Sequence, residues 1–217
     1  MNSVLKNLQK LNIDTSKIRL IAVTKYVDTD KIIEAYEAGI RNFAENRYQD
    51  AELKRKELPP EVEKNIIWHF IGHLQSNKAK KVTGNFEYIH SVDSVKLANQ
   101  ISKEAKEKNI IQKILIQVNV AEEETKFGFN LESIKEEFSE IIKFNSLNIQ
   151  GLMTIGPNVN DEITVRTAFK ELKKLKDSLQ DKYKYNLPEL SMGMSNDYKI
   201  AIQEGSTMIR LGQVLFK

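Results

Sequence analysis

Two periodicities alternate along this chain for most of its length. Eight short runs are apolar enough for buried strands, and stretches with helical spacing separate most of them. The eight runs are RLIAVTK, NFAEN, IIWHFIG, YIHSVD, KILIQVNV, IQGLMTIGP, LSMGMS and TMIRLG. Parallel neighbours in a sheet need a crossover connection, which is usually a helix. The alternation therefore predicts a parallel sheet in an α/β protein.

Eight strand–helix units can close into a (β/α)₈ barrel, and the chain has 217 residues, within the size range of that fold. An open doubly wound sheet is the alternative. However, no G-x-G-x-x-G motif follows the first strand run, so the main signature of a dinucleotide-binding sheet is missing. No domain boundary, repeat or low-complexity tract is visible. We therefore predict a single TIM-type barrel domain over residues 1–217, with an extra N-terminal helix.

Helical patterns and their capping residues support this reading. Val4, Leu5, Leu8 and Leu11 fall at helical spacing and predict an amphipathic N-terminal helix that packs on the barrel. Asp28 or Thr29 is expected to cap the second helix, and Ser94 a later one. The segment LPPEVEKN is expected to be a turn between a helix and a strand.

Composition excludes several classes of function. The formal net charge is only +3, too mild to indicate nucleic-acid binding. There is no cysteine, so disulfides, thiolate nucleophiles and cysteine-based metal sites are excluded. His69 and His73 are four residues apart, but they fall on a strand running into a loop, so no metal site is expected. The N-terminus resembles neither a signal peptide nor a membrane span, which favours a cytoplasmic location without membrane contact.

Polar and small residues collect where the predicted strands end, which is the ligand-binding end of such a barrel. These residues are Lys25, Glu45, Asn46, His69, Gly72, Asp93, Asn119, Thr154, Ser195, Arg210 and Gly212. Lys25 is the most informative, because it ends an apolar strand. It is either an ordinary solvated lysine or a functional amine at the barrel mouth.

Two segments near the C-terminus are suited to a phosphate. SMGMSND leads into a predicted helix, whose free N–H groups and dipole attract anions. RLGQ ends the last strand, where Gly212 permits close approach of the backbone. Barrels often bind phosphate between the loops after strands seven and eight. Ordinary glycine-containing turns are the alternative explanation for both segments.

A lysine on the first strand and a phosphate site after the last two are neighbours in a closed barrel. An aldehyde with a phosphate group would use both, because lysine forms an imine with an aldehyde. We expect burial at the barrel mouth to lower the pKa of Lys25, so that the free amine can react. Arg210 could then hydrogen-bond a ring nitrogen, unless it forms a structural ion pair.

The motifs AVTKY, NFAENRYQD, WHFIGHLQSNK, IHSVDS, LIQVNVAEEETKFGF, GLMTIG, LSMGMSNDYKIAI and GSTMIRLG resemble the pyridoxal phosphate homeostasis proteins. The resemblance runs in order from about residue 18 to residue 212. It implies a single barrel like the N-terminal domain of alanine racemase, with pyridoxal 5′-phosphate as cofactor. Of these motifs, WHFIGHLQSNK and LSMGMSND are the most specific.

The resemblance also implies roles for individual residues. Lys25 would hold pyridoxal phosphate as an internal aldimine, and Arg210 would face the pyridine nitrogen. Ser195 and the backbone at Gly212 and Gln213 would hold the phosphate, while Asn46 and His69 would line the pocket near the ring. The ending GQVLFK departs from the family pattern at Gln213. A backbone N–H bond to phosphate is therefore expected there instead of a side-chain hydroxyl bond.

The resemblance implies a carrier that acts in intracellular pyridoxal phosphate homeostasis with little or no turnover. An arginine facing the pyridine nitrogen would keep that nitrogen unprotonated and weaken carbanion chemistry. Alanine racemase takes a tyrosine base from a second domain, for which a chain ending at residue 217 leaves no room. We expect a monomer that binds pyridoxal phosphate, with apo pyridoxal phosphate enzymes as candidate recipients. The alternatives are an amino-acid racemase, with Tyr26 or His69 as second proton donor, and an aldolase-like barrel whose Lys25 binds a sugar phosphate.

Overall fold

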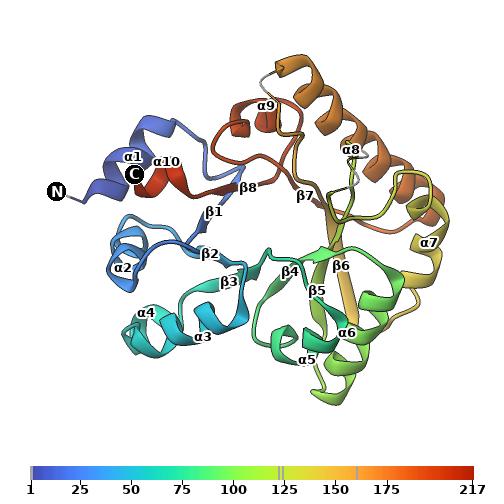
Figure 1. The fold of residues 1–217 in the computed structure, drawn as a ribbon, viewed down its shortest axis with the longest axis horizontal. Coiled ribbons are helices and arrows are strands. Elements are labelled where there is room, and N and C mark those ends of the chain that lie inside the picture. Colours follow the sequence, from blue (N-terminus) through green and yellow to red (C-terminus); the bar gives the residue numbers. More distant parts are fainter. Residues whose placement is uncertain (1, 122, 124, 160) are drawn as a thin grey trace.

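A closed barrel of eight parallel strands forms the centre of the protein (Figure 1). The structure is a computed structural model, and it describes residues 2–121, 123, 125–159 and 161–217. Each strand pairs with the next in the chain, and β8 pairs with β1 to close the barrel. The strands are β1 Arg19–Val23, β2 Asn42–Glu45, β3 Ile67–Phe70, β4 Tyr88–Val92, β5 Gln112–Gln117, β6 Leu147–Met153, β7 Glu189–Ser191 and β8 Met208–Leu211. The predicted (β/α)₈ barrel and all eight strand positions are confirmed.

Helices surround the strands on the outside (Figure 1). They are α1 Ser3–Leu11, α2 Thr29–Glu37, α3 Tyr48–Glu57, α4 Pro60–Glu63, α5 Ala79–Val82, α6 Val95–Glu107, α7 Ile134–Ile141, α8 Glu162–Tyr183, α9 Tyr198–Gln203 and α10 Gln213–Phe216, with a 3₁₀ turn η1 at Ser76–Lys78. Among the residues that the structure describes, no helix combines the length and apolar character needed to cross a membrane.

Two of the helix starts follow the capping signals in the sequence. The Asp28 carboxylate accepts a hydrogen bond from the Lys31 backbone N–H at 3.0 Å, so Asp28 caps α2. The Ser94 hydroxyl accepts one from the Leu97 N–H at 3.2 Å and caps α6. Both bonds satisfy backbone donors that a helix leaves free at its first turn.

Two local predictions are wrong. LPPEVEKN is not a simple turn, because Pro60–Glu63 forms the short helix α4 with proline at its first position, where the missing N–H costs nothing. Leu5 is exposed, whereas Val4 is buried and Leu8 and Leu11 pack against the core. The apolar stripe of α1 is therefore narrower than predicted.

The two terminal helices pack against each other. The Asn7 side-chain amide of α1 donates a hydrogen bond to the Leu215 carbonyl of α10 at 3.0 Å. Figure 1 shows these helices side by side next to β1 and β8. Because α10 begins at Gln213, directly after β8, α1 supports the segment in which a phosphate site is expected.

The barrel separates an inner from an outer apolar core. Alternate residues of each strand point to opposite faces. The larger core lies between strands and helices, while the inner one consists of Ile21, Ala44, Tyr88, Leu115, Met153 and Met208. The barrel interior is thus filled by side chains, and polar residues such as His69 and His90 are buried there with the apolar ones.

Candidate functional site

Lys25 lies just beyond β1, in a turn formed with Tyr26. Its ammonium group is 4.9 Å from the centroid of the Tyr26 ring. Among the described residues, no carboxylate forms an ion pair with it. Val23, the last residue of β1, packs against the inner core, and Lys25 follows it by two residues at the C-terminal end of the strand. The expectation that Lys25 is buried is wrong, because β1 ends before it and its side chain is exposed.

A buried ion pair fixes the backbone directly before Lys25. The Lys54 ammonium of α3 donates to the Thr24 carbonyl and to the Glu45 carboxylate, both at 2.6 Å. The Thr24 hydroxyl donates to the same Glu45 oxygen at 2.6 Å. Glu45 therefore faces α3 and not the ligand end of the barrel, because it lies on the outward alternation of β2. The structure uses this predicted strand-end residue to anchor the Lys25 turn.

His69 lies inside the barrel and not at its mouth. Its ring is fully buried and stacks on Tyr88, with the two centroids 4.8 Å apart. His69 Nδ1 is 2.8 Å from His90 Nε2, and His69 Nε2 is 3.1 Å from Asn42 Oδ1. His90 Nδ1 is in turn 2.9 Å from Ser191 Oγ. Both ring nitrogens of His69 thus have protein partners.

His90 and Ser191 were not identified from the sequence as site residues. Each is fully buried and points into the barrel from β4 or β7. The signal was present, because each is a polar residue within an otherwise apolar strand run, YIHSVD or LSMGMS. Only the three-dimensional register shows that they meet.

Burial keeps both histidines uncharged. Burial, together with the charges of Arg19 and Lys113, lowers the pKa of His69 to about 3. Burial holds the pKa of His90 well below its ordinary value, and electrostatic interactions with His69, Arg210 and Arg19 lower it further. The two histidine rings are therefore polar but uncharged at pH 7.

Arg210 extends from β8 into the barrel and is only 4% exposed. Nη1 donates to the Ser191 carbonyl at 2.9 Å and to its hydroxyl at 2.7 Å, and Nη2 donates to the Thr154 carbonyl at 2.9 Å. Burial lowers the pKa of Arg210 to about 10, against an opposing effect of Asp197. All three described acceptors are neutral. Arg210 is therefore a buried cation that no carboxylate in the described residues neutralises by direct contact.

The loops after β7 and β8 bring the predicted phosphate residues close to β1. Ser195 is half-buried in the loop between β7 and α9. In that loop Gly193 has φ +96°, and a Cβ on it would lie 2.6 Å from Ala201 Cβ, so only glycine fits. Gly212 precedes α10, and Gln213 is the first residue of that helix. Because β8 pairs with both β7 and β1, these loops and Lys25 follow neighbouring strands at the same end of the barrel.

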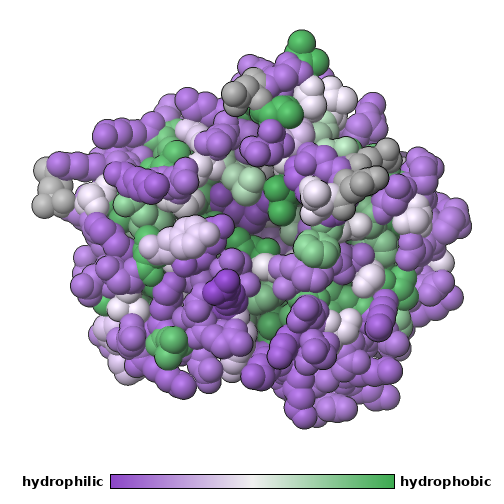
Figure 2. Space-filling model, viewed as in Figure 1, coloured by the Kyte–Doolittle hydropathy of each residue, from purple (hydrophilic) through white to green (hydrophobic). Residues whose placement is uncertain are grey.

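Asn46 lies after β2 on the same end of the barrel and lines a cavity of about 560 Å³ together with His73 and Lys78. His73 is in the following loop, where its ring stacks on Phe127 and Nδ1 is 3.2 Å from the Asp93 carboxylate. His69 thus lies on a strand and His73 in the loop after it, as predicted from the sequence. Figure 2 shows a hollow over the middle of the barrel, with hydrophilic and hydrophobic side chains at its edge.

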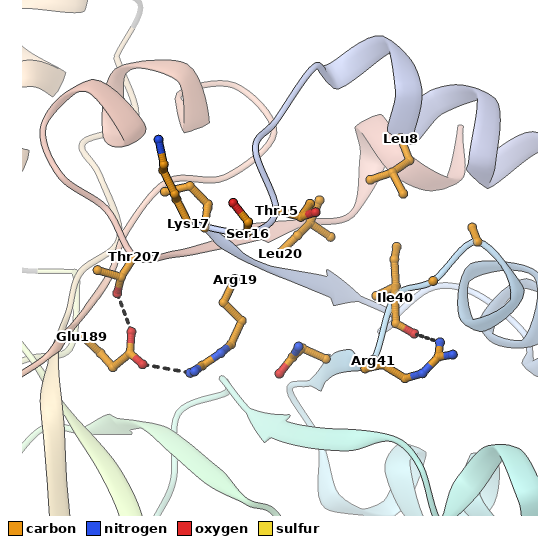
Figure 3. Close-up of a pocket in the computed structure, with 14 residues that line it drawn as sticks. Leu8, Thr15, Ser16, Lys17, Arg19, Leu20, Ile40, Arg41, Glu189 and Thr207 are labelled. Atoms are coloured by element: carbon orange, nitrogen blue, oxygen red, sulfur yellow. Dashed lines mark hydrogen bonds and ion pairs between the residues drawn. The ribbon is translucent and has the colours of Figure 1, made fainter.

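A cavity of about 590 Å³ lies at the opposite, N-terminal end of the strands (Figure 3). Arg19 there forms an ion pair with Glu189 at 3.0 Å, and Thr207 donates to the same carboxylate. Arg41 points away from Arg19 and donates to the Ile40 carbonyl at 2.9 Å. Lys25, Ser195 and Arg210 do not line this cavity. We therefore place the candidate site at the C-terminal end of the strands.

Comparison with known proteins shows a close relationship over nearly the whole chain. The family "Alanine racemase, N-terminal domain" matches residues 1–217. The pyridoxal phosphate homeostasis protein of Aquifex aeolicus is 42% identical over 198 residues, covering 91% of this chain and 86% of the relative. That of Synechocystis sp. is 44% identical over 199 residues, covering 92% and 90%.

Solved structures agree with this relationship. PipY of Synechococcus elongatus, solved without PLP, has a TM-score of 0.92 and 36% identity, with 99% of this chain and 100% of that chain covered. The same protein with PLP bound gives 0.90 and 35%, with the same coverage. Alanine racemase of Clostridium difficile has a TM-score of 0.80 at 14% identity and shares the fold, with this chain covering 57% of it.

Proposed function

We propose that this chain, which belongs to the pyridoxal phosphate homeostasis protein family, binds pyridoxal 5′-phosphate and acts in its homeostasis, with the cofactor held on Lys25 as a Schiff base. One observation carries the proposal. In the part of the chain that the structure describes, an exposed lysine that forms no ion pair follows β1, and a buried arginine with neutral hydrogen-bond acceptors lies on the paired strand β8, at the same end of the barrel. A ligand with an aldehyde and a ring acceptor complements both groups.

The residues present fit this cofactor. Arg210 retains N–H groups beyond its three hydrogen bonds, and a buried guanidinium favours an acceptor such as a pyridine nitrogen. The first N–H groups of α10, at Gln213 and Val214, have no partner within the helix and suit a phosphate. The Ser195 hydroxyl lies in the adjacent loop. We assign Asn46 to the edge of the ring pocket, and His69 to the layer beneath it.

We further propose that turnover is slight or absent. Bound pyridoxal phosphate withdraws electrons from an attached carbon most strongly when its ring nitrogen is protonated. Arg210 is a permanent donor and gives that nitrogen no proton. A racemase needs a second proton donor, yet both ring nitrogens of His69 already have partners inside the barrel. Tyr26 is 87% exposed, and no described contact directs its hydroxyl toward a ligand.

The decisive experiment is covalent trapping. Purified protein is incubated with pyridoxal phosphate, its absorption spectrum recorded, the imine reduced with borohydride and the modified residue located by mass spectrometry. We expect one equivalent of cofactor on Lys25. Lys25→Ala should abolish the band, whereas Lys17→Ala, an exposed lysine at the other end of β1, should leave it intact. Trapping on another lysine, or of a sugar phosphate in preference to pyridoxal phosphate, would refute the assignment.

A second measurement addresses turnover. With L-alanine and D-alanine in deuterated solvent, we expect no exchange at Cα above that of free pyridoxal phosphate. Fast exchange with inversion would establish the racemase instead.

We also propose that the protein acts in the cytoplasm as a monomer that exchanges pyridoxal phosphate with apo enzymes. Light scattering should give the chain mass of 25.0 kDa. Loaded protein should activate an apo pyridoxal phosphate enzyme in the presence of a phosphatase that destroys the free cofactor. Activation only by free cofactor would count against direct exchange.

A further inference from the structure

We propose that His69, His90 and Ser191 are positioning residues, which hold the Arg210 guanidinium through a hydrogen-bond chain of fixed direction that ends on Asn42. The chain crosses the barrel interior from β8 through β7, β4 and β3 to β2. Its effect on the cofactor rests on the proposed function. Its direction is a property of the protein alone.

The direction follows from arginine, which has donors and no acceptor. Arg210 Nη1 donates to Ser191 Oγ at 2.7 Å, so the Ser191 hydroxyl hydrogen must point elsewhere. The other described partner of this hydroxyl is His90 Nδ1, at 2.9 Å, and it must therefore be the unprotonated nitrogen.

The same argument continues to the other end of the chain. A neutral His90 with an unprotonated Nδ1 carries its hydrogen on Nε2 and donates to His69 Nδ1 at 2.8 Å. His69 then carries its hydrogen on Nε2 and donates to Asn42 Oδ1 at 3.1 Å. Both histidines are thus in the Nε2–H form, and every link has one donor and one acceptor.

The reverse direction leaves a donor without an acceptor. If His90 donated to Ser191 Oγ, that oxygen would receive hydrogen bonds from both His90 and Arg210. Its own hydrogen would then find no acceptor among these partners. Ser191 and both histidines are at most 1% exposed, so bulk water does not reach the chain to satisfy it.

The advantage of this arrangement is that it orients a cation without neutralising it. A carboxylate at position 191 would hold Arg210 as firmly, but it would cancel the positive charge that a ligand at the barrel mouth meets. The histidines add no charge of their own, because burial keeps them neutral. The hydrogen-bond chain therefore leaves the full charge of Arg210 available to the ring nitrogen of the cofactor.

The first test uses the protein without ligand. Nitrogen-15 NMR correlations distinguish Nδ1–H from Nε2–H tautomers, and we expect His69 and His90 both to be Nε2–H and neutral at pH 7. A Nδ1–H tautomer, or a cationic ring, at either histidine would overturn the proposed direction. This result does not depend on pyridoxal phosphate binding.

The second test breaks the chain and observes the cofactor. We expect Ser191→Ala to weaken pyridoxal phosphate binding roughly 5- to 10-fold, the loss of about one hydrogen bond. We also expect it to move the nitrogen-15 signal of ring-labelled cofactor toward the protonated form. Ser191→Thr keeps the hydroxyl and should behave like the wild type.

Ser91 on β4 offers a matched control. This serine is as buried as Ser191, but its hydroxyl has no described hydrogen-bond partner. Ser91→Ala should leave both the affinity and the ring-nitrogen signal unchanged. Equal ring-nitrogen signals in Ser191→Ala and wild type would overturn the positioning role. If Ser191→Ala does not fold, the tautomer spectra still decide the direction of the hydrogen-bond chain. If the wild-type protein does not bind pyridoxal phosphate, the proposed function is refuted, but the direction of the hydrogen-bond chain is not.

Discussion

Two arginines point into the same barrel from its paired strands β1 and β8, and their surroundings are opposite. Arg19, at the N-terminal end, forms an ion pair with Glu189 at 3.0 Å and donates to the Tyr88 hydroxyl. Among the residues that the structure describes, Arg210, at the C-terminal end, donates hydrogen bonds only to neutral oxygens of Ser191 and Thr154. One cation is therefore paired with a carboxylate, whereas the other forms no ion pair with any residue that the structure describes.

This contrast separates stability from function along the barrel axis. In barrels of this type, binding sites lie at the C-terminal ends of the strands, and the other end serves stability. This division between a stabilising end and a binding end fits a charge that is paired at one end and un-neutralised at the other. Changes at Arg19 should therefore affect mainly unfolding, and changes at Arg210 mainly binding.

The largest expected effect involves the histidines between the two arginines. In the folded state the pKa of His69 is about 3 and that of His90 is well below its ordinary value, whereas both are about 6.5 when unfolded. The unfolded chain therefore binds more protons below pH 6.5, and the free energy of unfolding falls as the pH falls. From pH 7 to 4.5 His69 alone should cost about 2.5 kcal/mol, and His90 adds to the loss in the same direction.

Urea denaturation at a series of pH values measures this loss. His90→Gln should make the dependence of the free energy of unfolding on pH shallower between pH 6.5 and 4.5. A slope that is the same in wild type and variant would show that His90 is not held neutral by the fold.

Arg210→Met should come next in size. Loss of hydrogen bonds from a charged donor corresponds to about 1.5–3 kcal/mol, so pyridoxal phosphate should bind roughly 10- to 150-fold more weakly. Equilibrium dialysis gives the dissociation constant. Arg210→Lys keeps the charge but not the planar fork, and should recover only part of the affinity. An unchanged affinity in Arg210→Met would remove this arginine from the site.

Arg19→Met should have a smaller effect, and this effect should be on the free energy of unfolding and not on binding. It leaves Glu189, whose side chain is 13% exposed, without its cation. We expect the free energy of unfolding to fall by about 1–2 kcal/mol, less than for a fully buried pair because Arg19 is partly solvated. Pyridoxal phosphate affinity should stay within about twofold. A binding defect as large as that of Arg210→Met would contradict the division between the two ends.

The smallest effect is expected for Lys25→Ala on stability. An exposed side chain that forms no ion pair with the described residues should change the free energy of unfolding by less than about 0.5 kcal/mol. Thermal unfolding without ligand checks this value. A large loss would show that Lys25 supports the fold, and the missing absorption band of this variant would then not report on the imine alone.

The fold was predictable because its signal is repeated eight times. Strand and helix periods alternate in a fixed order, and capping residues such as Asp28 and Ser94 mark helix starts. Local errors arose where one element carries little signal. The four-residue helix α4 is too short for periodicity, and Leu5 lies at the edge of an apolar stripe.

The site was predictable only in part, because a strand ending does not fix where a side chain points. Glu45 and His69 both come from strands that end at the ligand face, yet Glu45 turns outward to Lys54 and His69 lies inside the barrel. Which alternation faces inward is decided by register. The meeting of His90 with Ser191, 101 residues apart in sequence, depends on barrel closure. The assigned roles of Lys25 and the phosphate residues remain predictions.

Gly72 has a consequence for any attempt to redesign this protein. A Cβ at this position would lie 2.0 Å from the Asn46 carbonyl oxygen, so the connections after β2 and β3 touch backbone to backbone. No side chain fits between them. A grafted segment at one connection must therefore be exchanged together with the other. We expect natural changes in these two connections to occur together.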